Sequence, residues 1–479
     1  MNRRIQNLAW SLLLPLLPVC GLAQVNTQSS APLGASSRTV WPAANDDGTQ
    51  QSQIDQGNQG NVDAGPIGPL SSMRSVLPTQ NVEGSFFLPS FRATHRTTTN
   101  PCLASSACGG WAEDETVSGS FDLNIVKRQQ AFRLGYEGGS TFYYGGQNVG
   151  NYYQRDNQFH SADISETLSF RKWMLGVVDD FSYSPTSAFG YSGSNIAGVF
   201  GLGAFPGQLG GSIGGAAVPS QSVLTGLTSR YSNTSAGDVD FQPTVSTQLN
   251  GSVSYSELRF PSGQYYDSDQ LSVNGGFTRL IHRYIQLGLD YQYADYNFRN
   301  NPIRMETQSG MGLWGIRLRQ FTLRLGGGGQ WYTTQNVPGL GSSLRYTAVG
   351  DLGYLRGLTQ ISVIYHHGLS GGSGVLLGSS NDTLSGSVRH PLGRMWDMTI
   401  NSGYSRNSAV LGNGSFNSTF VGASVRRAIR QNMGLSFTYD MRRQAVPQVC
   451  PVTLPNCSTQ IGHDFGVGFD WSGRPIRIR

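Results

Sequence analysis

Charged and amide side chains recur on one face of segments that alternate between polar and apolar residues. In Ile285–Tyr293 every odd position is apolar or aromatic, whereas Gln286, Asp290 and Gln292 lie on even positions. A side-chain period of two is that of a β-strand, so the two sets face opposite sides. The polar set suits contact with water and can impose an electrostatic field. The apolar set must be kept out of water, either by packing against other apolar side chains or by contact with lipid.

The same phase assigns charged residues of both signs to the polar face of other segments. Such residues either line an aqueous path and set its field, or pair across strands and fill the interior. Both interpretations stay open for any single residue. The residues that we expect to face an enclosed lumen are Asp122, Arg133, Glu137, Asp163, Asp180, Asp290, Arg317, Arg324, Arg345, Asp351, Arg389, Asp397, Asp440, Arg442, Asp464 and Asp470.

Catalytic chemistry has little support in the sequence. His366 and His367 are adjacent, and neighbours in a strand face opposite sides, so they cannot both bind one metal ion. No serine is expected in a nucleophile elbow, because that motif needs a turn from a strand into a helix and no helix is predicted. Gly326–Gly329 is followed by no Lys-Ser/Thr pair, which argues against a phosphate loop. We therefore expect no enzyme activity, no catalytic residues, no cofactor and no metal.

The elements that must position the charged residues are long strands. The two-residue alternation recurs in Met433–Met441 and Phe465–Trp471. Alternating segments of roughly 9 to 13 residues match the length of a tilted strand that crosses a bilayer, whereas globular strands have roughly 5 to 6. Two arrangements satisfy such strands. Either their apolar faces pack on one another in a large sandwich, or they face lipid around a closed barrel that leaves no unpaired edge.

Turn lengths favour the barrel, because brief turns alternate along the chain with longer loops rich in Gly, Asn, Ser and Pro. We predict an all-β, closed antiparallel transmembrane β-barrel with short periplasmic turns and long external loops. The strand number is 18 if the weak segments Ser85–His95 and Val223–Ser232 both count, and 16 if both fail, because termini on the same side require an even number.

Composition agrees with a barrel of this kind. The chain has 479 residues with 63 glycines, only 13% charged residues and a mean hydropathy of −0.27. Half of each barrel strand is polar, so low hydropathy does not exclude a membrane. The net charge of +5 is spread along the chain without a basic block, which argues against nucleic acid as a partner.

The N-terminus predicts export. Arg3 and Arg4 precede the apolar run Leu8–Val19, and the small-residue site Gly21-Leu22-Ala23 follows. We expect a signal peptide at residues 1–23, a disordered periplasmic segment rich in Gln, Asn, Gly, Ser and Pro at 24–82, and the barrel at 83–479. A lipidated Cys20 is the alternative that the sequence leaves open.

Four cysteines remain beyond Cys20, as two close pairs. Cys102 lies near Cys108, and Cys450 lies near Cys457. An even number of cysteines in an exported protein predicts disulfides, and each pair would close a small loop within one connection. With 18 strands, both pairs fall in external loops that barrel closure makes neighbours.

Two further features bear on the barrel interpretation. Ser184–Pro219 is the longest irregular stretch, and it either folds inward as a constriction or lies across the external mouth. Aromatic residues at strand ends suit the girdles that flank the apolar band of a membrane barrel. These residues are Trp173, Tyr183, Tyr293, Trp331, Tyr332, Tyr354, Trp396, Tyr404 and Trp471.

With its signal, alternating strands and loop asymmetry, the chain resembles Gram-negative outer-membrane β-barrels of porin-like size. Such barrels end in a terminal aromatic residue, whereas here Ser-Gly-Arg-Pro-Ile-Arg-Ile-Arg follows Trp471. Either Phe465–Trp471 is the closing strand with a short tail, or Ile476 and Ile478 extend it.

The resemblance implies location and partners. It implies export to the periplasm and insertion in the outer membrane, with contacts to lipid and to the barrel-assembly machinery. The expected function is a channel for small polar solutes through a water-filled lumen of mixed charge. A non-conducting surface, adhesion or structural barrel and a polysaccharide export channel are the alternatives. The sequence leaves homo-oligomer formation open.

Overall fold

In the computed structural model, the chain divides into two units, Met1–Pro32 and Leu33–Arg479. Only residues of the second unit are described below. The described residues are 85–99, 111–144, 158–184, 229–261, 265–299, 301–336, 342–371, 376–411, 414–430, 432–445 and 460–478.

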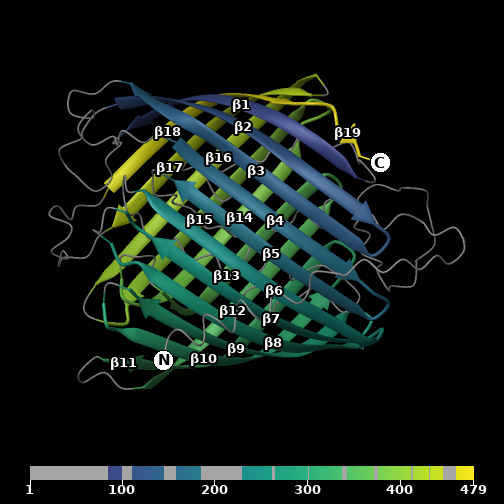
Figure 1. Cartoon of the computed structure of the whole chain (residues 1–479), viewed down its shortest axis with the longest axis vertical. Helices are drawn as coiled ribbons and strands as arrows, with labels where there is room; N and C mark the ends of the chain where they lie inside the picture. The colour runs from purple at the N-terminus through teal and green to yellow at the C-terminus, as the bar shows by residue number, and fades with distance from the viewer. Residues whose placement is uncertain are drawn as a thin grey trace, which may run out of the picture. The chain divides into compact units, whose positions relative to one another are not determined.

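The described part of the chain is built of β-strands that form one closed antiparallel sheet (Figure 1). The strands are β1 (Phe86–Thr99), β2 (Trp111–Lys127), β3 (Gln130–Tyr144), β4 (Gln158–Ser169), β5 (Trp173–Ser184), β6 (Arg230–Thr244), β7 (Thr247–Arg259), β8 (Ser268–His282), β9 (Ile285–Phe298), β10 (Arg304–Arg317), β11 (Phe321–Gln335), β12 (Ser343–Arg356), β13 (Thr359–Ser370), β14 (Ser379–Pro391), β15 (Trp396–Ala409), β16 (Ser415–Arg430), β17 (Met433–Ala445), β18 (Gln460–Ser472) and β19 (Ile476–Arg477). Each strand from β1 to β18 pairs with its neighbours in sequence.

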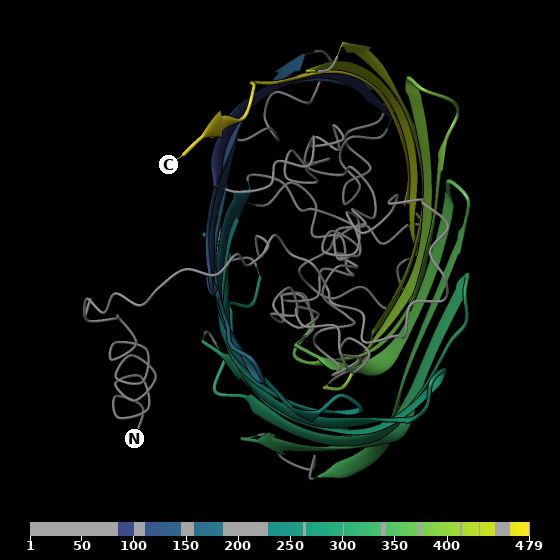
Figure 2. The same cartoon turned by 90° about the vertical axis from the view of Figure 1, so that its right-hand side faces the viewer.

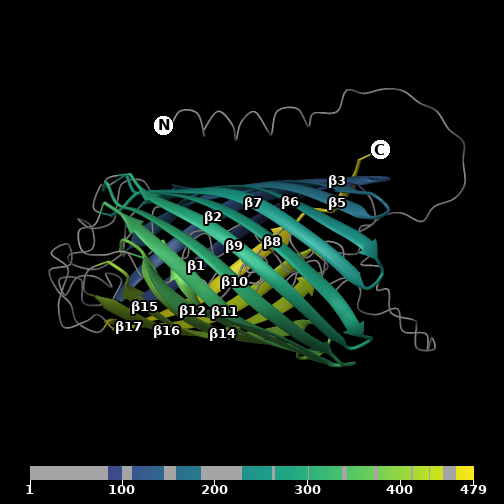
Figure 3. The ribbon, with the colours of Figure 1, turned by 90° about the horizontal axis from the view of Figure 1, so that it is seen from below.

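The sheet closes where the first long strand meets the last one. β1 pairs with β2 on one edge and with β18 on the other, and Ser90 lies opposite Ser472 in that second ladder. The closed ring is seen in Figure 2, and the oblique course of the strands in Figure 3. Because the two-residue β19 only continues the β18 ladder along β1, the described residues form a barrel of 18 long strands, as predicted.

Strand β9 shows how the sequence pattern becomes a barrel wall. Leu289 and Tyr291 leave 65% and 52% of their surface exposed, whereas Gln286 and Asp290 leave only 5% and 4%. The exposed residues of neighbouring strands lie in register, as Leu287 does with Trp314 of β10. The apolar side chains therefore form the outer surface and the polar ones face the interior. That order excludes a sandwich, which would bury the apolar faces.

The outer surface has the composition of a membrane barrel. Large apolar and aromatic side chains are exposed along the outward positions of the strands; Phe437 of β17, for example, leaves 44% of its surface exposed. In water such a surface would aggregate, whereas in lipid it needs no further cover. Closure satisfies the backbone hydrogen bonds, which a strand inside a bilayer requires.

Most predicted strands are present, but the sixth was placed wrongly. Val223–Ser232 was expected, whereas β6 begins at Arg230 and continues to Thr244. Its outward positions are apolar at both ends, with Tyr231 before and Val239 after, but Asn233, Ser235 and Gly237 interrupt the alternation between them. Cross-strand pairing with β5 and β7 holds this middle part in the sheet.

The strands are joined by brief turns at one end of the barrel and by longer connections at the other. The predicted brief turns are present, for example Arg128–Gln129 and Arg283–Tyr284. At the chain end, β18 stops at Ser472 and β19 follows with Ile476. Both expectations for the C-terminus are thus partly correct, since a short tail follows Trp471 and then pairs with β1.

Aromatic residues at strand ends follow the predicted girdles in part. Trp173, Trp331 and Trp396 are exposed on the outer face. The assignment of Tyr332 was wrong, because it is 5% exposed and packs with Tyr296 and other apolar residues in an interior cluster. Since adjacent residues face opposite sides, Tyr332 cannot share the outer face of Trp331.

Several expectations fall on residues outside the described part of the chain. They are the signal peptide at 1–23, the segment at 24–82, the lipidation site Cys20, both cysteine pairs (Cys102 with Cys108, Cys450 with Cys457) and all but the first residue of Ser184–Pro219. Within the described ranges, no helix is long and apolar enough to cross a membrane.

Candidate functional site

The candidate site is the inner wall of the barrel. Cross-strand pairings place the predicted charged residues at inward positions, opposite in phase to the exposed apolar residues. They are Asp122, Arg133, Glu137, Asp163, Asp180, Asp290, Arg317, Arg324, Arg345, Asp351, Arg389, Asp397, Asp440, Arg442, Asp464 and Asp470. That these side chains line a solute path stays a prediction.

Many of the inward charges form ion pairs. We call the inner faces of β16–β18 and β1–β4 the ion-paired arc. Arg133 Nη2 lies 3.0 Å from Asp122 Oδ1, and its Nε lies 3.9 Å from Asp163 Oδ2. Arg442 of β17 pairs with Asp464 of β18, which is 1% exposed. The remaining pairs of the arc are Arg96 with Asp114 and Arg426 with Asp470.

Three members of the ion-paired arc were missed by the sequence analysis: Arg96, Asp114 and Arg426. Arg96 and Asp114 lie directly opposite each other, and Arg96 Nε is 2.8 Å from Asp114 Oδ2. Arg96 lies one residue beyond the expected segment Ser85–His95, and β1 runs four residues past His95. Continuing the two-residue alternation would have found Arg96 and, opposite it, Asp114. Arg426 lies on the inward phase of β16, opposite Asp397, so strand phase alone would have found it.

Acidic residues also meet within the ion-paired arc. Asp440 lies directly opposite Asp464, and the two side chains are 3% and 1% exposed. Arg442 is two residues from Asp440 on the same face and holds Asp464 in an ion pair. Adjacent carboxylates repel each other, and either a proton on one of them or a neighbouring cation relieves the repulsion. Arg442 is the neighbouring cation here.

Charges on other strands repeat the pairing. Arg324 of β11 pairs with Asp351 of β12, and Arg389 Nη2 of β14 lies 2.7 Å from Asp397 Oδ2 of β15. Arg345 has a different partner, because its guanidinium lies 5.4 Å from the centre of the Tyr332 ring. These contacts fix the arginine heads against the wall.

The inner faces of β7, β8 and β9 differ, and we call them the amide arc. Their inward side chains include Gln248, Asn250, Asn274, Gln286 and Gln292, together with one carboxylate, Asp290. The basic residues of these three strands, Arg259 and Arg279, lie at outward positions. Within the strands described here, no arginine or lysine of β7–β9 faces the interior.

Asp290 has no hydrogen-bond partner among the residues that the structure describes. It is 4% exposed, and neither carboxylate oxygen has a hydrogen-bond donor. The Oε1 atoms of Gln248 and Gln286 are also buried without a donor. The amide nitrogens nearby are engaged elsewhere, because Gln248 Nε2 donates to Asp240 Oδ1 at 3.2 Å and Gln292 Nε2 donates to Ser272 Oγ at 3.3 Å. The amide arc thus presents acceptors and no free cation.

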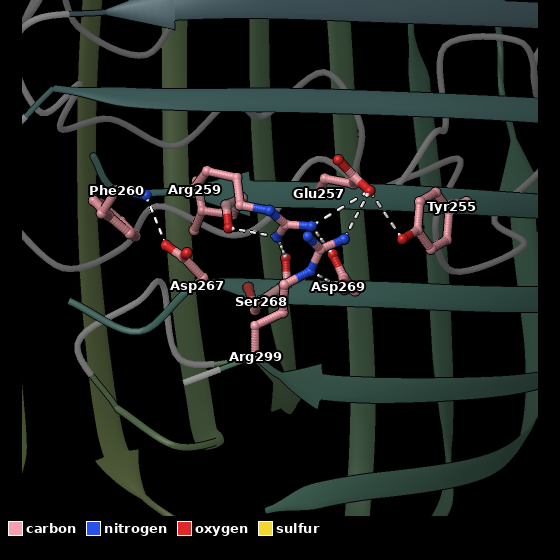
Figure 4. Close-up of polar contacts among 9 residues, drawn as sticks. Tyr255, Glu257, Arg259, Phe260, Asp267, Ser268, Asp269 and Arg299 are labelled. Atoms are coloured by element: carbon pink, nitrogen blue, oxygen red, sulfur yellow. Dashed lines mark hydrogen bonds and ion pairs between the residues drawn. The ribbon is translucent and has the colours of Figure 1, made fainter. Parts of the chain in front are cut away.

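A second charged cluster, which the sequence analysis missed, lies on the outer face where β7, β8 and β9 meet the longer connections (Figure 4). Arg299 Nε lies 2.9 Å from Asp269 Oδ2, and Arg299 Nη2 lies 3.5 Å from Glu257 Oε1. Arg259 pairs with the same two acids, and Tyr255 donates to Glu257 at 3.0 Å. The hydrogen bond to Asp269 raises the pKa of the Arg299 guanidinium.

This outer cluster has a sequence signal that parity alone gives. Glu257, Asp269 and Arg259 share the outward phase of apolar Val253 and Val273. Charges on the lipid-facing phase are costly within a bilayer and cheap at its interfaces. They therefore mark where the outer surface leaves the apolar band on this side of the barrel.

The two adjacent histidines lie on opposite faces, as strand geometry requires. His367 stacks on the outward Tyr346 with ring centroids 3.9 Å apart, and its Nδ1 lies 2.5 Å from Asp382 Oδ1. His366 lies at the inward position opposite Val349. Across the described ranges, no group of three or more His, Cys, Asp or Glu residues is placed to hold a metal ion.

Comparisons with known proteins give structural likenesses and no sequence match. No family model matches the sequence, and no curated protein matches it. Among solved structures, the outer membrane protein OpdK of Pseudomonas aeruginosa is similar, with 8% identity, a TM-score of 0.42, and coverage of 82% of this chain and 99% of that one. A BenF-like porin of Pseudomonas fluorescens has 9% identity and a TM-score of 0.43, and OccAB3 of Acinetobacter baumannii has 11% identity and a TM-score of 0.41. Each match covers 81% of this chain and 99% of the other one.

At such identities and scores, the likeness says nothing about solutes. Location follows from the barrel itself. An even number of antiparallel strands, a closed sheet, an apolar outer band and short turns at one end are the features of barrels in the Gram-negative outer membrane. The chain is a porin-like β-barrel of that membrane.

Proposed function

We propose that the protein is an outer-membrane channel that passes small polar solutes through a water-filled lumen of mixed charge. The observation that carries the proposal is the inner wall, where carboxylates, guanidinium groups and amides replace the apolar residues of the outer face. Barrels of roughly 16 to 18 strands are wide enough to enclose an aqueous channel.

The two arcs give the proposed channel its field. In the ion-paired arc, each carboxylate of the pairs Arg133–Asp122, Arg426–Asp470 and Arg442–Asp464 faces a guanidinium, so positive and negative charges largely cancel. In the amide arc, Asp290 has no cation beside it. The proposed lumen is therefore mixed in charge around its circumference rather than uniformly of one sign.

The proposal includes the route to the membrane. The expected signal peptide at residues 1–23 directs export, and the barrel-assembly machinery then inserts the strands. The outer band contacts lipid, and a channel of this kind needs no catalytic residues. The porins with similar folds are named for their outer-membrane location or for porin activity, which is the kind of function that we propose here.

Conductance tests the proposal directly. The purified full-length barrel, reconstituted in a planar lipid bilayer with KCl on both sides, is expected to produce stepwise current increments. The matched control is the same protein after heat denaturation, which removes the barrel but leaves the detergent and any contaminant. Folded protein that inserts, as shown by protease protection in vesicles, yet never conducts would reject the channel and leave a surface or structural barrel.

A further inference from the structure

Asp290 is a buried carboxylate that lacks the arginine partner of Asp351, Asp464 and Asp470. Both of its oxygens are without a donor, although it is 4% exposed. Burial of an ionised carboxylate without a partner costs several kcal/mol, and hydrogen bonding or an opposite charge is the usual compensation. Asp464 has such a partner in Arg442. Among the described residues, no group supplies this compensation at Asp290.

The row that contains Asp290 places a second polar side chain on the same part of the wall. One cross-strand row runs Asn250, Gly276, Asp290 and Met311. Gly276 has no side chain, and the Asn250 amide leans over it so closely that a Cβ at that position would collide with the amide. The Asn250 amide thus fills the space over Gly276, in the same row as the carboxylate.

Further acceptors continue from this row toward the short turns. The next row contains Gln248, Thr278 and Gly288, and Gln286 lies in the row after it, beside the start of β9. The Oε1 atoms of both glutamines are buried without donors. The amide arc therefore offers oxygen acceptors in successive rows, with Asp290 as the one formal charge.

We infer that the amide arc recognises the ammonium group of a cationic organic solute, with Asp290 as the charged anchor and Gln248 and Gln286 as hydrogen-bond acceptors along its path. The inference rests on the proposed channel function. An ammonium group supplies both what the carboxylate lacks and what the amide oxygens lack, because it carries a positive charge and three N–H donors.

Other ligand classes fit the amide arc less well. An anion would meet Asp290 with no arginine or lysine from β7–β9 to offset the repulsion. A metal ion prefers several convergent oxygen, nitrogen or sulfur ligands, and no such group of His, Cys, Asp or Glu is present in the described residues. An ammonium group tolerates acceptors that are spaced along a wall.

The test combines binding and current. The purified full-length protein is titrated with n-butylammonium by calorimetry, and the same probe is added to single channels in bilayers. Asp290→Asn keeps the shape of the side chain and removes its charge. We expect this variant to lower the calorimetric affinity about tenfold and to raise the half-blocking concentration by the same factor. A tenfold change is the size of one charged hydrogen bond. Asp290→Ser is the second variant if the first folds poorly.

Two controls make the test specific. Asp295→Asn changes the same residue type on the same strand but at an outward position, where Asp295 pairs with Arg304, and it should leave the affinity unchanged. Tetramethylammonium carries the charge without N–H donors, so it should bind more weakly than n-butylammonium.

The outcomes separate the two proposals. A wild-type channel that conducts but whose affinity for n-butylammonium is unchanged in both Asp290 variants overturns the ammonium site and leaves the channel. Protein that shows Asp290-dependent binding without any current keeps the binding site and overturns the channel. Protein that neither conducts nor binds overturns both.

Discussion

The ion-paired arc and the amide arc have similar sequence patterns and different chemistry. Both consist of alternating strands with acidic residues on the inward phase. In the first, Asp464 meets Arg442 across one ladder, whereas in the second, Asp290 meets Gly276 and Met311. The difference teaches that phase decides which way a charge faces, while the neighbouring strand decides whether that charge stabilises the wall or remains available to a solute.

The largest expected effect comes from breaking the ion-paired arc. Arg442→Ala should lower the free energy of unfolding by about 3 to 5 kcal/mol, because Asp464 and Asp440 then stay buried beside each other without the guanidinium. Urea unfolding in lipid vesicles, followed by tryptophan fluorescence, measures the change. Arg443→Ala is the control, since that residue is exposed on the outer face of the same strand. Equal effects of the two variants would contradict the comparison.

The opposite sign is expected in the amide arc. Asp290→Asn should raise the free energy of unfolding by about 1 kcal/mol or more, because it removes a buried charge that has no partner. The same unfolding assay applies, with Asp295→Asn as the outward control. A loss of stability as large as that of Arg442→Ala would show that Asp290 is bound within the wall after all.

A smaller effect concerns ion selectivity. Asp122→Asn leaves Arg133 with only the more distant Asp163, at 3.9 Å, so the local field becomes more positive. The reversal potential in a KCl gradient should shift toward anion selectivity. The shift should shrink in about 1 M salt, where the screening length is roughly 3 Å. A shift that is independent of salt would argue against an electrostatic origin.

The smallest effect is expected on the outer cluster. Arg299→Ala removes contacts to Asp269 and Glu257 from a side chain that is 46% exposed. Exposed ion pairs contribute only about 0 to 1 kcal/mol, so unfolding in urea should change by less than that. A larger loss would show that this cluster holds the ends of β7, β8 and β9 together.

Strand phase was predictable from the sequence because period-two alternation survives in almost every strand. It failed in the middle of β6, where Asn233 and Ser235 occupy outward positions between Tyr231 and Val239. Partner choice was not predictable. Arg442 and Asp464 belong to separate strands joined by a long connection, and their meeting depends on a register that no local pattern encodes.

That Asp290 lacks a hydrogen-bond donor could not be predicted from the sequence for the same reason. The sequence shows a carboxylate among amides, but whether it is satisfied depends on where those amides donate. Gln248 donates to Asp240 of β6, and Gln292 donates to Ser272 of β8. Each of these hydrogen bonds depends on how two strands pair. The buried acceptors without donors in the amide arc therefore arise only in the folded sheet.

The seam between β1 and β18 ties the order of synthesis to the order of assembly. The His463 amide donates to the Thr99 hydroxyl across 364 residues of chain, at 2.9 Å. Until the last strand is delivered, β1 and β17 both present unpaired edges that invite association with other chains. A polypeptide that lacks its last strand would therefore be prone to aggregate with other chains. A recognition signal in the last strand would restrict assembly to chains that have been synthesised to the end.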